Sequence, residues 1–112
     1  MPSASLAVTA GDPCGIGPEG VLKALRRRRG ALARVPLVVI GDWPVFRDCA
    51  RALGMPIPRW PILRAGTSRA SVRAPVTFLD CGHRGRFRFG RPSRASGAAS
   101  LAYLDEAIRL WR

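Results

Sequence analysis

The 112-residue sequence predicts an α/β fold built on a parallel sheet. Segments typical of strands and of helices alternate along the first half of the chain. The apolar run at 35–42 is nearly continuous, which is typical of a strand covered on both faces. With 47% hydrophobic and 23% charged residues, the composition is that of a globular domain. The length leaves room for one domain, so we expect a single α/β segment over residues 1–112.

The first strand and helix of this unit are expected over residues 5–10 and 18–29. The apolar run at 5–10 ends in a Gly/Pro cluster and predicts a buried strand leading into a turn. Pro18 suits the first turn of a helix, and Glu19 follows close behind it. The arginines that end this segment complement the helix dipole, and Gly30 can terminate the helix.

The central part of the chain predicts three strands and one helix. A buried strand over 35–42 leads into a helix over 43–53, which Asp42 is placed to cap. A short strand around 60–63 is expected at a sheet edge, because its neighbouring prolines cannot donate to a ladder. A further strand is expected within 75–82.

The C-terminal part predicts an amphipathic helix that starts at about Ser93. Its apolar residues recur at helical intervals: Ala98, Leu101, Leu104, Ile108 and Trp111. No glycine, proline or polar cap follows them, so we expect the chain to be the front portion of a longer protein. Apolar faces prepared for absent elements would then leave an exposed patch.

The stretch after the first strand matches the dinucleotide fingerprint G-x-G-x-x-G at Gly15, Gly17 and Gly20. Asp42 follows roughly 20 residues later, where such a fold holds an acid for the ribose. However, Pro18 removes one amide donor, and Asp42 is equally explained as a helix cap. A plain turn followed by a capped helix therefore remains the alternative.

Charge and cysteine content restrict the function classes. The net charge is +12, and Lys23 is the only lysine among 19 cationic residues. Such an excess attracts nucleic acid or phosphorylated substrates, or it is solvated surface. The basic segment 83–94 alternates arginine with Phe87 and Phe89, which suits either base stacking or a half-exposed strand with its phenylalanines inward.

Three widely spaced cysteines fit no disulfide framework, which favours a reducing cytoplasm. Nothing in the sequence predicts a signal peptide or a membrane span. We interpret Cys14 as a small buried residue rather than a reactive thiol. His83 near Cys81 is interpreted as a loop residue, so we assign no metal-binding and no catalytic residue to this chain.

Four strings carry a resemblance to a known family. They are GDPCGIGPE (11–19), PLVVIGD (36–42), ARALGMPI (50–57) and GRPSRASGAASLAYLDEAI (90–108). In order and spacing they resemble the N-terminal third of the 4-hydroxythreonine-4-phosphate dehydrogenase family. The first string is also similar to one in isocitrate and isopropylmalate dehydrogenases. The resemblance implies a partial three-layer α/β unit of that fold, which binds its nicotinamide cofactor without a true Rossmann domain.

The resemblance further implies NAD-dependent, metal-assisted oxidation and decarboxylation of a phosphorylated hydroxy amino acid in pyridoxal 5'-phosphate biosynthesis. It implies a homodimer, with a divalent cation held by histidines beyond this chain, so the chain alone is expected to be inactive. The cofactor-binding residues that it suggests are Gly11, Asp12, Gly15, Gly17, Pro18 and Glu19.

Three other functions stay open. Related dehydrogenases of the same family oxidise other hydroxy acids, including four-carbon sugar acid phosphates and a dihydrodiol. The chain could instead be a noncatalytic remnant, or a basic module that binds nucleic acid.

Overall fold

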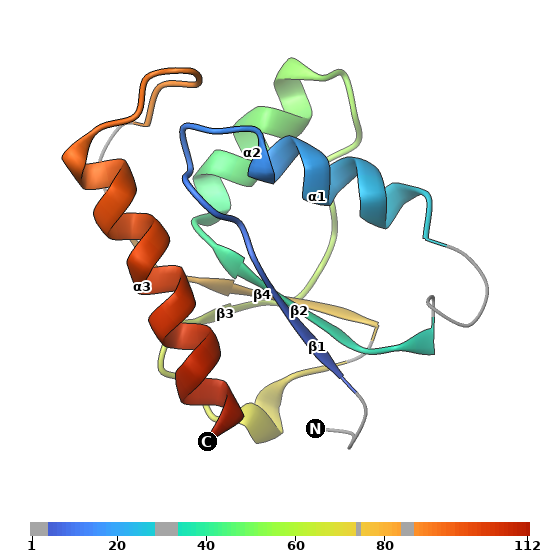
Figure 1. Ribbon diagram of the computed structural model, residues 1–112. Helices are drawn as coiled ribbons and strands as arrows, with labels where there is room; N and C mark the ends of the chain where they lie inside the picture. Colours follow the sequence, from blue (N-terminus) through green and yellow to red (C-terminus); the bar gives the residue numbers. More distant parts are fainter. Residues whose placement is uncertain (1–4, 29–33, 74, 84–86) are drawn as a thin grey trace.

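Four parallel strands form one sheet in the order β1-β2-β4-β3 (Figure 1). The computed structural model describes residues 5–28, 34–73, 75–83 and 87–112. The strands are β1 (Leu6–Thr9), β2 (Leu37–Gly41), β3 (Ile62–Arg64) and β4 (Val76–Asp80). Because β4 lies between β2 and β3, the short β3 is an edge strand, as its neighbouring prolines predict.

Helices cover both faces of this sheet. They are α1 (Gly17–Arg26), α2 (Trp43–Ala52) and α3 (Arg94–Trp111), and a 3-10 turn, η2 (Arg69–Ser71), precedes β4. α3 packs across β1 and β2, whereas α1 packs on α2 and α2 reaches β4. Figure 1 shows α3 on one side of the sheet and the other two helices on the opposite side. The predicted three-layer α/β arrangement is confirmed.

The core lies where β2 and β4 run side by side. Every residue of β2 is buried, which explains the unbroken apolar run in its sequence. On the face toward α2, the ring of Phe78 contacts Phe46 and Trp43 at centroid distances of 4.9 and 5.2 Å. Because side chains alternate along a strand, the neighbouring Leu79 faces α3.

Two helix and strand predictions need correction. Residues 6–9 form an edge strand in which Leu6 is 51% exposed, and not the buried strand that the apolar run predicted. α1 ends at Arg26 with Arg27 as its C-cap, so the helix stops inside the arginine run. Gly30, the predicted terminator, lies outside the described residues.

α3 begins as predicted, but its apolar stripe faces outward. Ser93 is the N-cap and exchanges hydrogen bonds with Ser96 in a capping box. The face that packs on the sheet carries Ser96, Ala99, Tyr103, Glu106 and Leu110. The stripe of Ala98, Leu101, Leu104, Ile108 and Trp111 lies exposed. No helix in the described part of the chain has the length and apolar character needed to cross a membrane.

Candidate functional site

Asp12 shapes the glycine-rich loop between β1 and α1. Its Oδ1 accepts a hydrogen bond from the backbone N–H of Cys14 at 2.8 Å, and its carbonyl accepts one from Gly15 at 2.9 Å. Its Oδ2 accepts from the hydroxyl of Ser96 at 3.1 Å, which joins the loop to the start of α3. Asp12 therefore ties together two segments that are far apart in the sequence.

The glycines of the fingerprint have different surroundings. A Cβ on Gly17 would lie 1.9 Å from the carbonyl oxygen of Ala10, so no other residue fits there without moving the backbone. A Cβ on Gly15 would meet the carbonyl of Asp12 at 3.3 Å, whereas one on Gly20 would meet nothing within 4 Å. Gly17 thus allows α1 to start against the end of β1.

α1 starts without a side-chain cap. Ile16 is its N-cap residue and makes no capping hydrogen bond, which corrects the alternative of a capped helix. Pro18 lies in the first turn, and Glu19 follows with its carboxylate 3.4 Å from the Nζ of Lys23. The start of this helix is therefore held by the loop's own backbone contacts rather than by a polar side chain.

Cys14 is 1% exposed, which confirms its interpretation as a small buried residue. Its carbonyl accepts a 2.7 Å hydrogen bond from the N–H of Gly90. This bond attaches a tight turn, in which Arg88 and Arg91 pair and Gly90 has φ +77°, to the glycine-rich loop. The turn replaces the half-exposed strand: Phe87 packs against the core, whereas Phe89 is 72% exposed.

A cleft of about 610 Å³ opens between this turn, the glycine-rich loop and α2. Its volume falls within the range of small-molecule sites, roughly 300–1,000 Å³. Apolar side chains form most of its lining, with the charged groups of Glu19, Asp48 and Arg88 among them. The other lining residues are Pro13, Gly15, Pro18, Pro44, Val45, Cys49, Ala52, Leu53, Phe87 and Phe89.

The structure brings three of the six predicted cofactor residues to this cleft: Gly15, Pro18 and Glu19. The remaining three, Gly11, Asp12 and Gly17, do not line it. Gly11 has φ +70° at the turn out of β1, and the contacts of the other two are within the protein. The sequence did not indicate that α2 forms the wall of the cleft opposite the glycine-rich loop. The apolar spacing of the helix that carries Asp48 and Cys49 predicted only that this helix packs on the core.

Asp42 does not cap α2 with its side chain, contrary to the prediction. Its buried carboxylate accepts a hydrogen bond of 2.7 Å from the backbone N–H of His83 and pairs with the ring Nδ1 of the same residue at 2.8 Å. The hydroxyl of the fully buried Tyr103 also donates to it. The N–H of Trp43 instead donates to Asp80 at 3.1 Å, because β2 and β4 end side by side and bring that acid to α2.

This buried cluster changes the chemistry of its neighbours. Burial, and then the hydrogen bond and the charge of Asp42, raise the pKa of Tyr103. Burial raises the pKa of Cys81 to about 12, with further contributions from Asp42, Glu106 and Asp80. Both groups therefore stay protonated near neutral pH. Within the described residues, no group of three or more His, Cys, Asp and Glu side chains could hold a metal ion.

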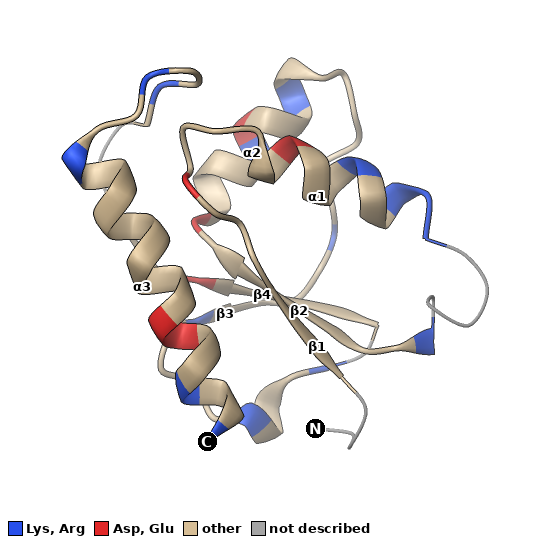
Figure 2. Cartoon of the chain, in the orientation of Figure 1, with Lys and Arg blue, Asp and Glu red and all other residues tan. Residues whose placement is uncertain are grey.

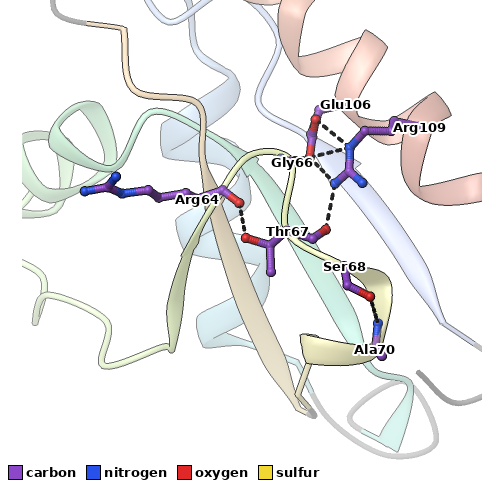
Figure 3. Close-up of polar contacts among 7 residues, drawn as sticks. All are labelled: Arg64, Gly66, Thr67, Ser68, Ala70, Glu106 and Arg109. Atoms are coloured by element: carbon purple, nitrogen blue, oxygen red, sulfur yellow. Dashed lines mark hydrogen bonds and ion pairs between the residues drawn. The ribbon is translucent and has the colours of Figure 1, made fainter.

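A second polar cluster joins α3 to the turn after β3 (Figure 3). One carboxylate oxygen of Glu106 accepts from the N–H of Gly66 at 2.9 Å, and the other accepts from Nε of Arg109 at 3.0 Å. Arg109 also donates to the carbonyl of Thr67 at 2.9 Å. The hydrogen bond from Arg109 is the main cause that lowers the pKa of Glu106, opposed in part by burial.

Cationic residues are spread over the described part of the chain. Figure 2 shows them at the end of α1, beside the start of α3, and near its C-terminal end. Acidic residues lie on some of the same elements, including α1 and α3. In this view the cationic residues belong to several elements of the described chain.

The fold and the cleft together define the class: an α/β unit with a cleft of small-molecule size at the carboxyl ends of parallel strands. No family model matches the sequence. Comparison with curated proteins is more specific, because over nearly its whole length the chain is homologous to 4-hydroxythreonine-4-phosphate dehydrogenases. The resemblance predicted from the four strings is therefore confirmed.

Three relatives illustrate this homology. The 4-hydroxythreonine-4-phosphate dehydrogenases of Erythrobacter litoralis and Synechocystis are 33% and 36% identical over 109 and 107 residues. The D-threonate 4-phosphate dehydrogenase of Cupriavidus necator is 32% identical over 111 residues. These matches cover 97%, 92% and 96% of this chain, but only 32%, 28% and 32% of the relatives. The chain thus spans about a third of their length.

Solved structures agree on the fold. A 4-hydroxythreonine-4-phosphate dehydrogenase from Klebsiella pneumoniae superposes with a TM-score of 0.69 at 29% identity, over 96% of this chain and 33% of that chain. The 4-hydroxythreonine-4-phosphate dehydrogenase from Burkholderia phymatum superposes with a TM-score of 0.75 at 24% identity, over 98% of this chain and 33% of that chain. At this identity the likeness shows the fold alone.

Proposed function

We propose that this chain forms part of a nicotinamide-dependent dehydrogenase that acts on a phosphorylated hydroxy acid. One observation carries the proposal: in a chain homologous to dehydrogenases, the glycine-rich string borders a cleft of about 610 Å³. The names of the relatives specify 4-hydroxythreonine 4-phosphate and D-threonate 4-phosphate. Both are four-carbon hydroxy acids with a terminal phosphate, and this is the substrate class that we propose.

The groups that line the cleft suit a nicotinamide cofactor. Arg88 can donate to a phosphate, and the carboxylates of Glu19 and Asp48 can accept from ribose hydroxyls. The rings of Phe87 and Phe89 offer flat apolar surfaces to an aromatic base. When bound, the cofactor supplies a hydride acceptor.

The described residues do not fit the divalent cation. The ring Nδ1 of His83 is engaged by Asp42, and no cluster of three or more ligating side chains exists in the described part of the chain. We propose that the cation, if the enzyme uses one, is held by residues outside those described. We therefore expect the chain by itself to bind cofactor without turning over substrate.

Titration of the chain with NAD⁺ by calorimetry tests the cofactor site. We expect saturable binding that Arg88→Ala weakens roughly tenfold, because a charged hydrogen bond to phosphate is lost. Arg91→Ala is the matched control, since Arg91 lies in the same turn but does not line the cleft. Equal loss in both variants, or no binding by the unmodified chain, would contradict the proposed site.

Substrate choice is tested in a chimera in which this chain replaces the matched third of the E. litoralis relative. Formation of reduced cofactor is measured with 4-hydroxythreonine 4-phosphate and with D-threonate 4-phosphate. We expect kcat/KM to favour one of the two phosphorylated acids. A folded chimera that oxidises neither would refute the proposed reaction.

A homodimer and a reducing cytoplasm remain part of the proposal. All three cysteines, Cys14, Cys49 and Cys81, are free, which suits a reducing compartment. We propose no nucleic-acid partner, since the homology over nearly the whole chain is to dehydrogenases.

A further inference from the structure

A second cavity lies at the amino ends of the strands, at the opposite end of the sheet from the cleft. Its volume of about 340 Å³ is near the lower limit for small-molecule sites, roughly 300 Å³. Val76, the first residue of β4, lines it together with Pro75 and with Leu25 and Arg26 of the last turn of α1. The other lining residues are Leu22, Arg28, Met55, Pro56, Pro58 and Trp60. Figure 1 shows how α1 runs back along the sheet, so that one end of the helix borders the cleft and the other end borders this cavity.

The cavity has an aromatic wall and an apolar floor. The half-buried ring of Trp60 lies nearly parallel to that of Phe78, at a centroid distance of 6.5 Å, and meets Trp43 edge-on at 6.4 Å. Leu22 and Val76 are only 3% and 6% exposed, and they form the floor. A flat ring held by two others offers a stacking surface to an aromatic ligand.

The rim of the cavity is rigid. Three of its residues are prolines, whose φ is fixed and which have no N–H to donate. The N–H of Met55 donates to the carbonyl of Ala50 at 2.9 Å, and the carbonyl of Pro75 accepts from the N–H of Leu37 at 2.9 Å. The cavity therefore keeps its shape without a ligand, which lowers the entropic cost of binding one.

The charged groups of the cavity are all positive. Arg26 and Arg28 are its charged residues among those that the structure describes. The guanidinium of Arg28 donates to the carbonyl of Val35, whereas Arg26 forms no ion pair with a described residue, because the acid of α1, Glu19, pairs with Lys23. Arg26 also complements the negative end of the α1 dipole. That role explains its place on the helix, but it does not explain the aromatic wall beside it.

We propose that this cavity binds a small aromatic carboxylate, at a site separate from the proposed cofactor cleft. The ring of the ligand lies against Trp60, over the apolar floor. Its carboxylate accepts hydrogen bonds from the guanidinium of Arg26, so the negative charge of the ligand complements the positive charge of the lining. The inference goes beyond the proposed function and does not depend on it.

An NMR titration of the isotope-labelled chain with 2-naphthoate tests this site. We expect saturable chemical-shift changes at the indole N–H of Trp60 and at the backbone N–H groups of Leu25 and Val76. The matched ligand control is 2-naphthylmethanol, which has the same rings but no charge. It should bind roughly tenfold more weakly, because the charged hydrogen bond to arginine is lost.

Two variants separate a specific contact from the general charge of the chain. Arg26→Gln should weaken binding of 2-naphthoate roughly tenfold and leave binding of 2-naphthylmethanol nearly unchanged. Arg27→Gln is the matched control, since it removes the same charge from the next position, which does not line the cavity. It should change the affinity for neither compound. Circular dichroism checks that both variants remain folded.

Three results would overturn the inference. They are the absence of saturable shifts at Trp60, shifts gathered instead at cleft residues such as Glu19 and Cys49, and an equal loss of affinity in Arg26→Gln and Arg27→Gln. The last result would mean that the positive chain attracts the anion only in a general way. Saturation at Trp60 that depends on Arg26 supports the inference whether or not the chain binds NAD⁺, so failure of the cofactor proposal is distinguishable.

Discussion

Replacing Gly17 by alanine should destabilise the protein, whereas the same change at Gly20 should stabilise it. The new Cβ at residue 17 would lie 1.9 Å from the carbonyl oxygen of Ala10, an atom of the backbone that no rotamer change can move. Ala10 itself donates to Ile40 on β2, so moving it also disturbs that hydrogen bond. Overpacking costs about 1–3 kcal/mol, and loss of the hydrogen bond costs about 1 kcal/mol. Gly17→Ala should therefore lower the free energy of unfolding by about 2–4 kcal/mol.

Urea unfolding followed by circular dichroism measures both effects. With a slope of about 2 kcal/mol/M for a domain of this size, Gly17→Ala should lower the midpoint by about 1–2 M. Gly20 lies in α1 with open space around it, so Gly20→Ala should raise stability by about 0.5–1 kcal/mol through helix propensity. Equal stability of Gly17→Ala and the unmodified chain would refute the steric argument.

Three further predictions concern the polar clusters. Tyr103→Phe should cost about 1–2 kcal/mol in urea unfolding, because it removes a donor from the buried Asp42 carboxylate. The pKa of Glu106 is lowered in the folded state. The ionised side chain therefore stabilises the fold at pH values above 4.5, its ordinary pKa, and this stabilisation is lost as the pH falls through the folded-state pKa. Unfolding free energies should consequently fall less on acidification in Glu106→Gln than in the unmodified chain; parallel pH profiles would contradict this. With the pKa of Cys81 at about 12, iodoacetamide at pH 8 should modify that thiol far more slowly in the folded chain than in urea, and similar rates would argue against its protection.

The elements were predictable because their signals are local. The unbroken apolar run of β2, the prolines beside β3 and the helical spacing that begins at about Ser93 each act within a few residues, and each prediction was confirmed. The end of α1 was predicted too far along, since arginine is compatible with both a helix and the turn after it.

The partners of polar side chains were not predictable in the same way. Asp42 directly precedes a helix, which indicates a cap, but its partners His83 and Tyr103 are 41 and 61 residues away. Only the parallel alignment of β2 with β4 brings Asp80 to the helix in its place. The opposite wall of the cleft was missed for a related reason: α2 and the turn at Arg88 approach the glycine-rich loop in space, and no spacing in the sequence records that approach.

The hydrogen bond from Tyr103 to Asp42 also bears on how the chain folds. Asp42 directly follows β2 early in the sequence, but the hydroxyl that donates to it lies on α3, near the end of the chain. Until that helix is in place, enclosing the end of β2 would leave the Asp42 carboxyl group without one of its hydrogen-bond partners, at a cost of about 1–3 kcal/mol. The sheet and α3 are thereby coupled across a long loop of chain, which favours a single cooperative transition and slows it through the entropy of closing that loop.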